Sequence, residues 1–194
     1  MKKVFYSIGL FFNSVRIFPL WLLLKYKQII QKDSEALKFN EDISYFTESF
    51  FSLLFKRPEY KTLIYRRLGY ISYPFKIICG TYPCYIENKY SMPFGGGCWI
   101  DHPHGSHINA KSIGQNLKIK HNVTIGNNHD KLPVIGDNVF VGCGACILGG
   151  VTVGNNVSIG ANCVIVKDVP DNATVVGNPA VIVKLNGEKV NIKL

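Results

Sequence analysis

The sequence has no long hydrophobic run. The longest uninterrupted apolar piece near the N-terminus is Leu20 to Leu24, far short of the roughly 20 residues that a membrane-spanning helix needs. The segment begins with two lysines, as a signal peptide would, but Asn13, Arg16 and Pro19 interrupt it and no small-x-small cleavage site follows. We therefore expect neither a clean membrane span nor a secretory signal. Two interpretations stay open: a basic interfacial helix within residues 1–30, or aromatics that pack a small helical domain or a subunit contact.

Acidic residues are few, with 13 Asp and Glu against 22 Lys and Arg, which gives a formal net charge of +9. The excess lies in residues 1–90, which hold 14 basic and 7 acidic residues. None of the usual nucleic-acid-binding motifs accompanies this charge. An anionic membrane surface or an anionic substrate fits the basic, aromatic first half better than nucleic acid does.

The cysteines lack the paired spacing of a zinc ribbon. Cys143 and Cys146 form a lone CxxC, but both fall inside a repeat that accounts for their spacing. Reduced thiols in a reducing compartment are the simplest interpretation of the six cysteines. We expect a cytoplasmic protein, with peripheral contact at the inner face of the cytoplasmic membrane as an extension of that prediction.

A six-residue period runs through the second half of the chain. From Ile113 an aliphatic residue opens each unit, glycine usually follows, and a small or aliphatic residue recurs at the fifth place, as in IGDNVF, VGCGAC and VGNNVS. Such a unit suits a short strand followed by a tight corner. Three units would close a triangular coil, and successive coils would stack at the strand spacing of about 4.8 Å. Nine units in one direction predict a solenoid.

The period is broken once, because Ile125 and Ile135 are ten residues apart and four residues are therefore inserted around NNHDKLP. An insertion must leave the coil as a loop, and such loops often contribute to a binding surface. Residues 1–70 are predicted to be helical, with one helix through EYKTLIYRRL that ends at Gly69. We expect an N-terminal helical domain at 1–75, a coil domain at 76–184 and a C-terminal tail at 185–194.

The hexads ending in IGANCVIVKDVPDNATVVGNPAVIVK, preceded by GGGCWIDHPHG, resemble those of the hexapeptide-repeat acyltransferases, and within them the serine acetyltransferase-like branch. The resemblance covers roughly residues 40–184. It implies a mainly β fold, a left-handed parallel β-helix, assembled as a homotrimer. It also implies transfer of an acetyl group from acetyl-CoA to a hydroxyl.

In that family the histidine of an Asp-His pair is the general base, and an acidic residue 15 positions earlier orients it. The matching residues are His102, next to Asp101, and Glu87, which stands where the serine enzymes carry aspartate. The chemistry needs such a dyad, because a hydroxyl attacks a thioester poorly unless a base takes its proton. A carboxylate beside the imidazole would fix its tautomer and favour the imidazolium formed during attack.

The histidines permit a second interpretation. A three-histidine metal site, as in carbonic anhydrases built on the same coil, would need side chains that converge from separate turns or subunits. The candidates are His102, His104, His107, His121 and His129. The sequence around them matches the acetyltransferase pattern better, so no metal is expected.

For acetyl-CoA, the resemblance implies a groove along the last coils and a lysine near the KDVP turn, close to the CoA phosphates. The matching positions are Cys143, Ala161, Val166 and Lys167. The first three would act mainly through main-chain atoms, whereas Lys167 would contribute its charge.

The acceptor is predicted from departures from the family pattern. INAKS replaces a GET stretch, and Lys131 and Leu132 stand where an Arg and a His bind the amino acid, so a bidentate carboxylate contact is missing. With the basic N-terminal half, this favours a sugar hydroxyl in a bacterial surface polysaccharide such as capsule, or its precursor. Trp99, Asp101, His104 and Lys131 are the candidate acceptor contacts, and Trp99 could stack on a sugar ring. The alternatives are serine O-acetylation in cysteine biosynthesis and a scaffold without catalysis.

Overall fold

The computed structural model describes residues 27–37, 59–73, 76–77, 80–81, 84–86 and 92–194. The chain divides into two compact units, Met1–Tyr82 and Pro83–Leu194, which are considered separately. The proposed interfacial segment, apart from its last residues, and the proposed orienting residue Glu87 lie outside the described residues.

The first unit contains helices α2 (Lys27–Leu37) and α4 (Tyr60–Leu68) and the 3₁₀ turn η2 (Gly69–Ser72). The helix predicted through EYKTLIYRRL is confirmed as α4, and it ends at Gly69, whose positive φ of 60° suits a residue without a Cβ. Arg67 on α4 donates to both carboxylate oxygens of the buried Asp33 on α2, at 2.9 and 3.1 Å. Of the helices that the structure describes, none has the length and apolar character to cross a membrane.

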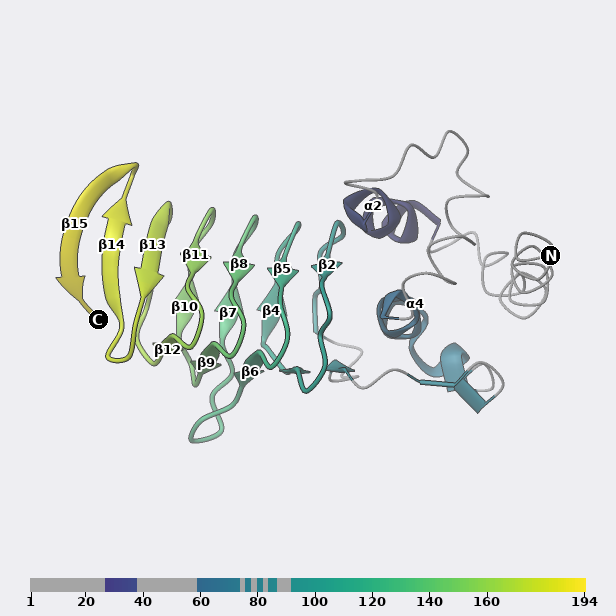
Figure 1. Ribbon diagram of the computed structural model, residues 1–194. Coiled ribbons are helices and arrows are strands. Elements are labelled where there is room, and N and C mark those ends of the chain that lie inside the picture. Colours follow the sequence, from purple (N-terminus) through teal and green to yellow (C-terminus); the bar gives the residue numbers. More distant parts are fainter. Residues whose placement is uncertain (1–26, 38–58, 74–75, 78–79, 82–83, 87–91) are drawn as a thin grey trace, which may run out of the picture. The chain divides into compact units, whose positions relative to one another are not determined.

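The second unit is a left-handed parallel β-helix, as predicted, and its short strands stack in three sheets (Figure 1). The first sheet holds β1 (Tyr85–Ile86), β3 (His107–Ile108), β6 (Thr124–Gly126), β9 (Cys146–Leu148) and β12 (Val164–Ile165). The second sheet holds β4 (Ser112–Ile113), β7 (Val134–Ile135) and β10 (Thr152–Val153). The third sheet holds β2 (Trp99–Ile100), β5 (Lys118–Ile119), β8 (Phe140–Val141), β11 (Ser158–Ile159), β13 (Ala173–Val176), β14 (Val181–Leu185) and β15 (Glu188–Lys193).

The hexad pattern explains the core of this unit. The aliphatic residue that opens each unit points inward, and so does the residue at the fifth place; Ile119, Val139 and Ile159 are fully buried examples. Residues of equal place in successive coils pair in register, as Ile119 does with Val141 and Val141 with Ile159. Inward side chains therefore stack in columns of identical or similar shape, which is how a strand of two residues can still bury a continuous core.

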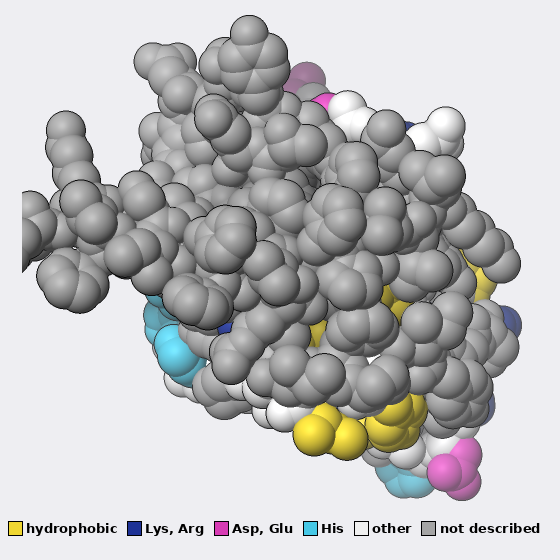
Figure 2. Space-filling model, turned by 90° about the vertical axis from the view of Figure 1, so that its right-hand side faces the viewer, with side chains coloured by type: hydrophobic (Ala, Val, Ile, Leu, Met, Phe, Trp, Pro, Cys, Tyr) yellow, Lys and Arg dark blue, Asp and Glu magenta, His cyan; other side chains and the backbone are white. Residues whose placement is uncertain are grey.

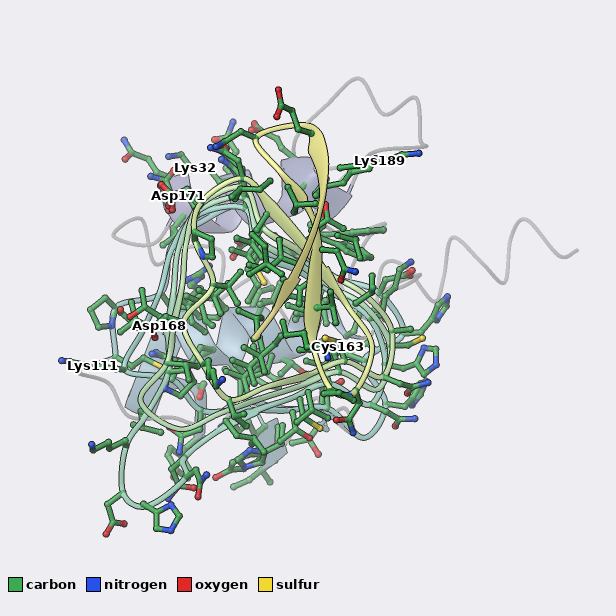
Figure 3. The ribbon with its side chains drawn as sticks, turned by 90° about the vertical axis from the view of Figure 1, so that its left-hand side faces the viewer. Lys32, Lys111, Cys163, Asp168, Asp171 and Lys189 are labelled. Carbon is green, nitrogen blue, oxygen red and sulfur yellow. The ribbon has the colours of Figure 1, made fainter. Side chains whose placement is uncertain are left out.

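Three kinds of corner join the sheets: the His102 corner, the loop corner and the Asn corner. The His102 corner joins the third sheet to the first at residues 101–106, 120–123, 142–145 and 160–163. The loop corner joins the first sheet to the second at residues 109–111, 127–133, 149–151 and 166–168. The Asn corner joins the second sheet to the third at residues 114–117, 136–139, 154–157 and 170–172. Figure 3, a view along the coil, shows this triangle, with Lys111 and Asp168 both projecting at the loop corner.

A ladder of side-chain amides runs down the Asn corner. Each asparagine has a positive φ, and each except the last donates through Nδ2 to Oδ1 of the next asparagine along the ladder, over distances of 2.8–3.1 Å. The ladder consists of Asn116, Asn138, Asn156, Asn172 and Asn186. Asparagine tolerates the left-handed conformation better than most residues, so one residue type both makes the corner and links successive coils.

The coil extends beyond the hexads at both ends. It begins at β1, well before Ile113, because Ile86, Ile100 and Ile108 fill the same inward columns although their spacing is irregular. At the other end, the segment 185–194 expected to be a tail contains β15, which pairs antiparallel with β14. The parallel stack therefore ends in an antiparallel hairpin.

Candidate active site

His102 lies in a strained turn at the end of β2. Its φ is 48°, a left-handed conformation that is uncommon for residues other than glycine, although histidine, asparagine and aspartate adopt it more often than the rest. Its carbonyl accepts from the backbone N–H of His104 at 2.7 Å, and the carbonyl of His104 accepts from the backbone N–H of Asn122 in the next coil at 2.9 Å. The imidazole is 72% exposed. The turn is thus tied to the coil by its backbone and presents the ring to solvent, where a substrate can reach it.

The carboxylate of Asp101 lies between two basic side chains. Its Oδ1 atom is 3.6 Å from Nε2 of His102, whereas Oδ2 pairs with the ammonium of Lys120, one coil further on. The ammonium of Lys120 is also 4.8 Å from the centre of the Trp99 ring, a cation–π distance. Of the predicted site residues, His102, Asp101, Trp99 and His104 are therefore neighbours at the first His102 corner.

The predicted loop is confirmed as a small hairpin at the loop corner. Asn128 and Lys131 form an antiparallel bridge through backbone hydrogen bonds of 3.1 and 3.2 Å. The two residues between them, His129 and Asp130, both have positive φ, at 51° and 58°, as in a type I′ turn. The turn folds Lys131 back onto the coil.

Two glycines let the hairpin lie close to the next coil. A Cβ built on Gly150 would stand 3.0 Å from Cβ of Lys131, and one on Gly149 would stand 3.3 Å from Cβ of Asn128. A larger residue at Gly150 would push the hairpin outward. The Gly-Gly pair of the ILGGVT unit therefore sets the height of the loop above the coil.

An open cavity of about 600 Å³ lies between this hairpin and the last two coils. Its lining includes Lys131, Val166 and Lys167, three of the predicted site residues, and also His129 and Asp168. Asp168 accepts a hydrogen bond from the backbone N–H of Thr152 at 2.7 Å, which fixes the turn that carries Lys167. Two lysines and an exposed Val166 give the cavity a cationic wall beside an apolar one.

Cys143 and Ala161 lie elsewhere, at the His102 corner. The carbonyl of Cys143 accepts from the backbone N–H of Asn162 at 2.9 Å, so one of its main-chain groups is already used within the coil. Gly142 lies under Ala161, since a Cβ on it would approach the Ala161 nitrogen to 2.7 Å. These two positions form a strip along the His102 corner in successive coils.

The sequence-predicted residues therefore form two groups within one chain. His102, His104, Asp101, Trp99, Cys143 and Ala161 lie at or beside the His102 corner, and Lys131, Val166 and Lys167 lie at the loop corner. The width of the first sheet separates the two corners, roughly 15 Å for about five residues of extended chain. Lys120, which sequence analysis did not select, belongs to the first group. Only the coil register, which places β5 beside β2, brings it there.

The histidines do not gather. Within the described residues, no three side chains of His, Cys, Asp or Glu lie close enough together to hold a metal ion. Figure 2 shows histidine side chains at two separate places along the edge of the described surface. His107 instead stacks on the exposed Tyr85, with ring centres 4.9 Å apart.

Residues 133–167 match the family described as Bacterial transferase hexapeptide (six repeats). The chain carries this transferase hexapeptide repeat. The sequence is also 44% identical over 123 residues to serine acetyltransferase 3, mitochondrial, of Arabidopsis thaliana, covering 56% of this chain and 31% of that protein. It is 42% identical over 110 residues to the serine acetyltransferase of Staphylococcus xylosus, covering 54% and 51%. The chain thus spans about half or less of the length of these relatives.

The structure of Neisseria gonorrhoeae serine acetyltransferase in complex with serine has a similar fold. The TM-score is 0.62 at 28% identity, over 80% of this chain and 68% of that one. The expected likeness of the hexapeptide coil to this branch is confirmed.

The predicted sugar acceptor is wrong, and so is its assignment to capsule or other polysaccharide synthesis. The relatives found are serine acetyltransferases, which was the alternative. The prediction relied on Lys131 and Leu132 at the exposed hairpin. Sequence identity of 42–44% over more than 100 residues to serine acetyltransferases is the stronger evidence about the acceptor. Lysine also keeps the positive charge that a carboxylate needs, although not the fork of an arginine.

Proposed function

We propose that the protein is an acetyl-CoA-dependent O-acetyltransferase that acts on the hydroxyl of L-serine, with His102 as general base. The observation that carries the proposal is an exposed imidazole, held by a strained turn on a coil of transferase hexapeptides. Strained residues in folded proteins cluster at functional sites. The named activity of the relatives supplies the reaction.

The reaction needs one proton acceptor and one oxyanion site. His102 takes the proton of the serine hydroxyl as its oxygen attacks the thioester carbonyl of acetyl-CoA. The resulting oxyanion needs N–H donors in the surrounding backbone. When it collapses, the carbon–sulfur bond breaks, the acetyl group stays on the serine oxygen, and the imidazolium returns its proton to the departing thiolate. Glu87 is the proposed orienting carboxylate.

Acetyl-CoA would bind at the cavity beneath the hairpin. Lys167 and Lys131 offer cations to its phosphates or to the acceptor carboxylate, and Val166 offers apolar surface to the pantetheine arm. The strip of Cys143 and Ala161 at the other corner is the proposed main-chain contact nearer to the thioester.

A homotrimer would bring the two groups together. Serine is only about 5 Å long, given the dimensions of one residue, so it cannot reach both the His102 corner and Lys131 of the same chain. In the proposed trimer, symmetric packing of coils side by side would place the loop corner of one subunit against the His102 corner of the next. Asp101 and Lys131 would then offer opposite charges to the ammonium and the carboxylate of one amino acid.

The test is release of CoA thiol from acetyl-CoA by the purified full chain, with and without L-serine, and identification of O-acetylserine by mass spectrometry. His102→Ala should lower kcat/KM by about 10²–10⁴-fold, the usual contribution of a general base. His121→Ala, in the corresponding turn of the next coil, is the matched control and should cost far less. Turnover that does not depend on serine, or full activity of His102→Ala, would refute the proposal.

A further inference from the structure

Lys120 is a charged residue beside His102 that the proposed mechanism leaves unused. Its ammonium is held between the Asp101 carboxylate and the face of Trp99. Its side chain is one-third exposed and that of Asp101 only 15% exposed. A partly buried ion pair on an aromatic ring is screened less by water than a pair at the open surface.

The Lys120–Asp101 ion pair affects His102 because the Asp101 carboxylate lies close to both side chains. Its Oδ1 atom is 3.6 Å from Nε2 of His102, too far for a good hydrogen bond but close enough for charge to act. A lone carboxylate at this place would favour the charged imidazolium. The Lys120 ammonium neutralises that carboxylate and also repels an imidazolium. Both effects favour the neutral ring, which is the form that can accept a proton.

Other charged or titratable groups lie on the elements around this turn. On β5, the ammonium of Lys118 is 5.8 Å from the centre of the Trp99 ring. His104 lies in the same turn, and His121 lies in the corresponding turn of the next coil. Among these groups, Lys120 is the one that the described contacts join directly to the carboxylate beside His102.

We propose that Lys120 is a positioning residue, which holds the Asp101 carboxylate and offsets its negative charge beside the His102 imidazole. This inference rests on the proposed role of His102 as base. It gives Asp101 a second part besides any contact with the acceptor, because its carboxylate transmits the charge of Lys120 to the imidazole.

The experiment compares the pH dependence of kcat/KM in the wild type, Lys120→Met and Lys120→Arg. Methionine keeps an apolar stem to cover Trp99 but removes the charge, whereas arginine keeps the charge and serves as the matched control. In Lys120→Met the acid limb should move to higher pH by about 0.5 unit, the size expected of one charge roughly 6 Å away in water. Lys120→Arg should keep the wild-type limb. Coincident profiles of Lys120→Met and the wild type would overturn the proposal.

A second measurement needs no turnover. The ring signal of His102, assigned by its loss in His102→Ala, is followed by NMR as pH is changed, and its midpoint should be higher in Lys120→Met. The same pair is then compared in an Asp101→Asn background, where the difference should shrink. An equal difference there would show that Asp101 is not the intermediary and would refute the proposal. Absence of acetyl transfer by the wild type would refute the proposed function instead, and the NMR comparison would still decide the role of Lys120.

Discussion

At the scale of single residues, the corner positions with positive φ differ in the residue types that occupy them. At the Asn corner these positions hold asparagine from Asn116 on, and Gly97 stands at the corresponding place before β2. At the His102 corner they hold Gly105, Asn122, Gly144 and Asn162, and His102 is an additional one in the first coil. His129 in the hairpin of the loop corner also has a positive φ, so the backbone conformation alone does not distinguish His102. The feature that does is its exposed imidazole beside the carboxylate of Asp101.

The cysteines differ in their surroundings, and this gives a prediction for their reactivity. Burial raises the pKa of the Cys84 thiol to about 12 and also raises that of Cys163. Since the thiolate is the reactive form, neither should react with iodoacetamide at pH 8 in the folded protein, whereas the half-buried Cys143 should. Mass spectrometry of labelled peptides checks this.

The same burial predicts how stability depends on pH. The thiol of an unfolded chain ionises near its ordinary pKa of 9.0, whereas burial raises the pKa of folded Cys84 to about 12. The unfolded state thus binds fewer protons in this range, and the coil should lose stability as pH rises from 9.0 to about 12. Cys84→Ser should flatten this loss in denaturant titrations. Rapid labelling of Cys84 at pH 8, or equal pH dependence in the variant, would contradict the assignment.

At the scale of elements, the Asn ladder separates two contributions to stability. Asn138→Ala removes two amide hydrogen bonds and also places alanine at a φ of 56°, and it should lower the free energy of unfolding by roughly 2–3 kcal/mol. Asn138→Gly removes the same bonds without the steric strain. Urea unfolding of both variants should find glycine the less damaging. A higher free energy of unfolding for Asn138→Ala than for Asn138→Gly would show that alanine is not strained at this corner.

The hairpin of the loop corner offers a test of the cavity. Gly150→Ala places a methyl group 3.0 Å from Cβ of Lys131, so the Lys131 side chain must shift by a few tenths of an ångström, and displacement of a binding group lowers activity. We expect a lower kcat/KM with little change in the unfolding temperature. Gly126→Ala is the control, because its Cβ would meet nothing closer than 4.0 Å. Equal kcat/KM values in the two variants would show that the position of the hairpin does not affect catalysis.

The sequence predicts these elements to different degrees. The hexad period predicts the coil, its core columns and the inserted loop, because each inward residue repeats at a fixed spacing. It does not predict β1 or β15, since Ile86 and Ile108 follow no hexad and Val190 lies on an antiparallel strand. The Lys120–Asp101 pair is 19 residues apart and becomes visible only when the register of β2 and β5 is known.

At the scale of the whole molecule, the two groups of site residues predict complementation between subunits. His102→Ala and Lys131→Glu chains should each be nearly inactive. When they are mixed equally as trimers, roughly a quarter of the interfaces pair an intact His102 with an intact Lys131, so about that fraction of activity should return. Refolded mixtures with the two variants differently tagged would be assayed with serine. Full inactivity of verified mixed trimers would show that one chain builds its own site.

The hairpin of β14 and β15 has a consequence for how the protein behaves in a crowded solution. A stack of parallel rungs offers its last rung as a template for any other extended chain. Here the chain reverses direction, and β15 presents Glu188, Lys189 and Lys193 at the outer margin. Charged side chains on an edge strand oppose pairing with strands of other chains. Within the described residues, the charged margin of the segment 181–194 therefore opposes growth into fibres.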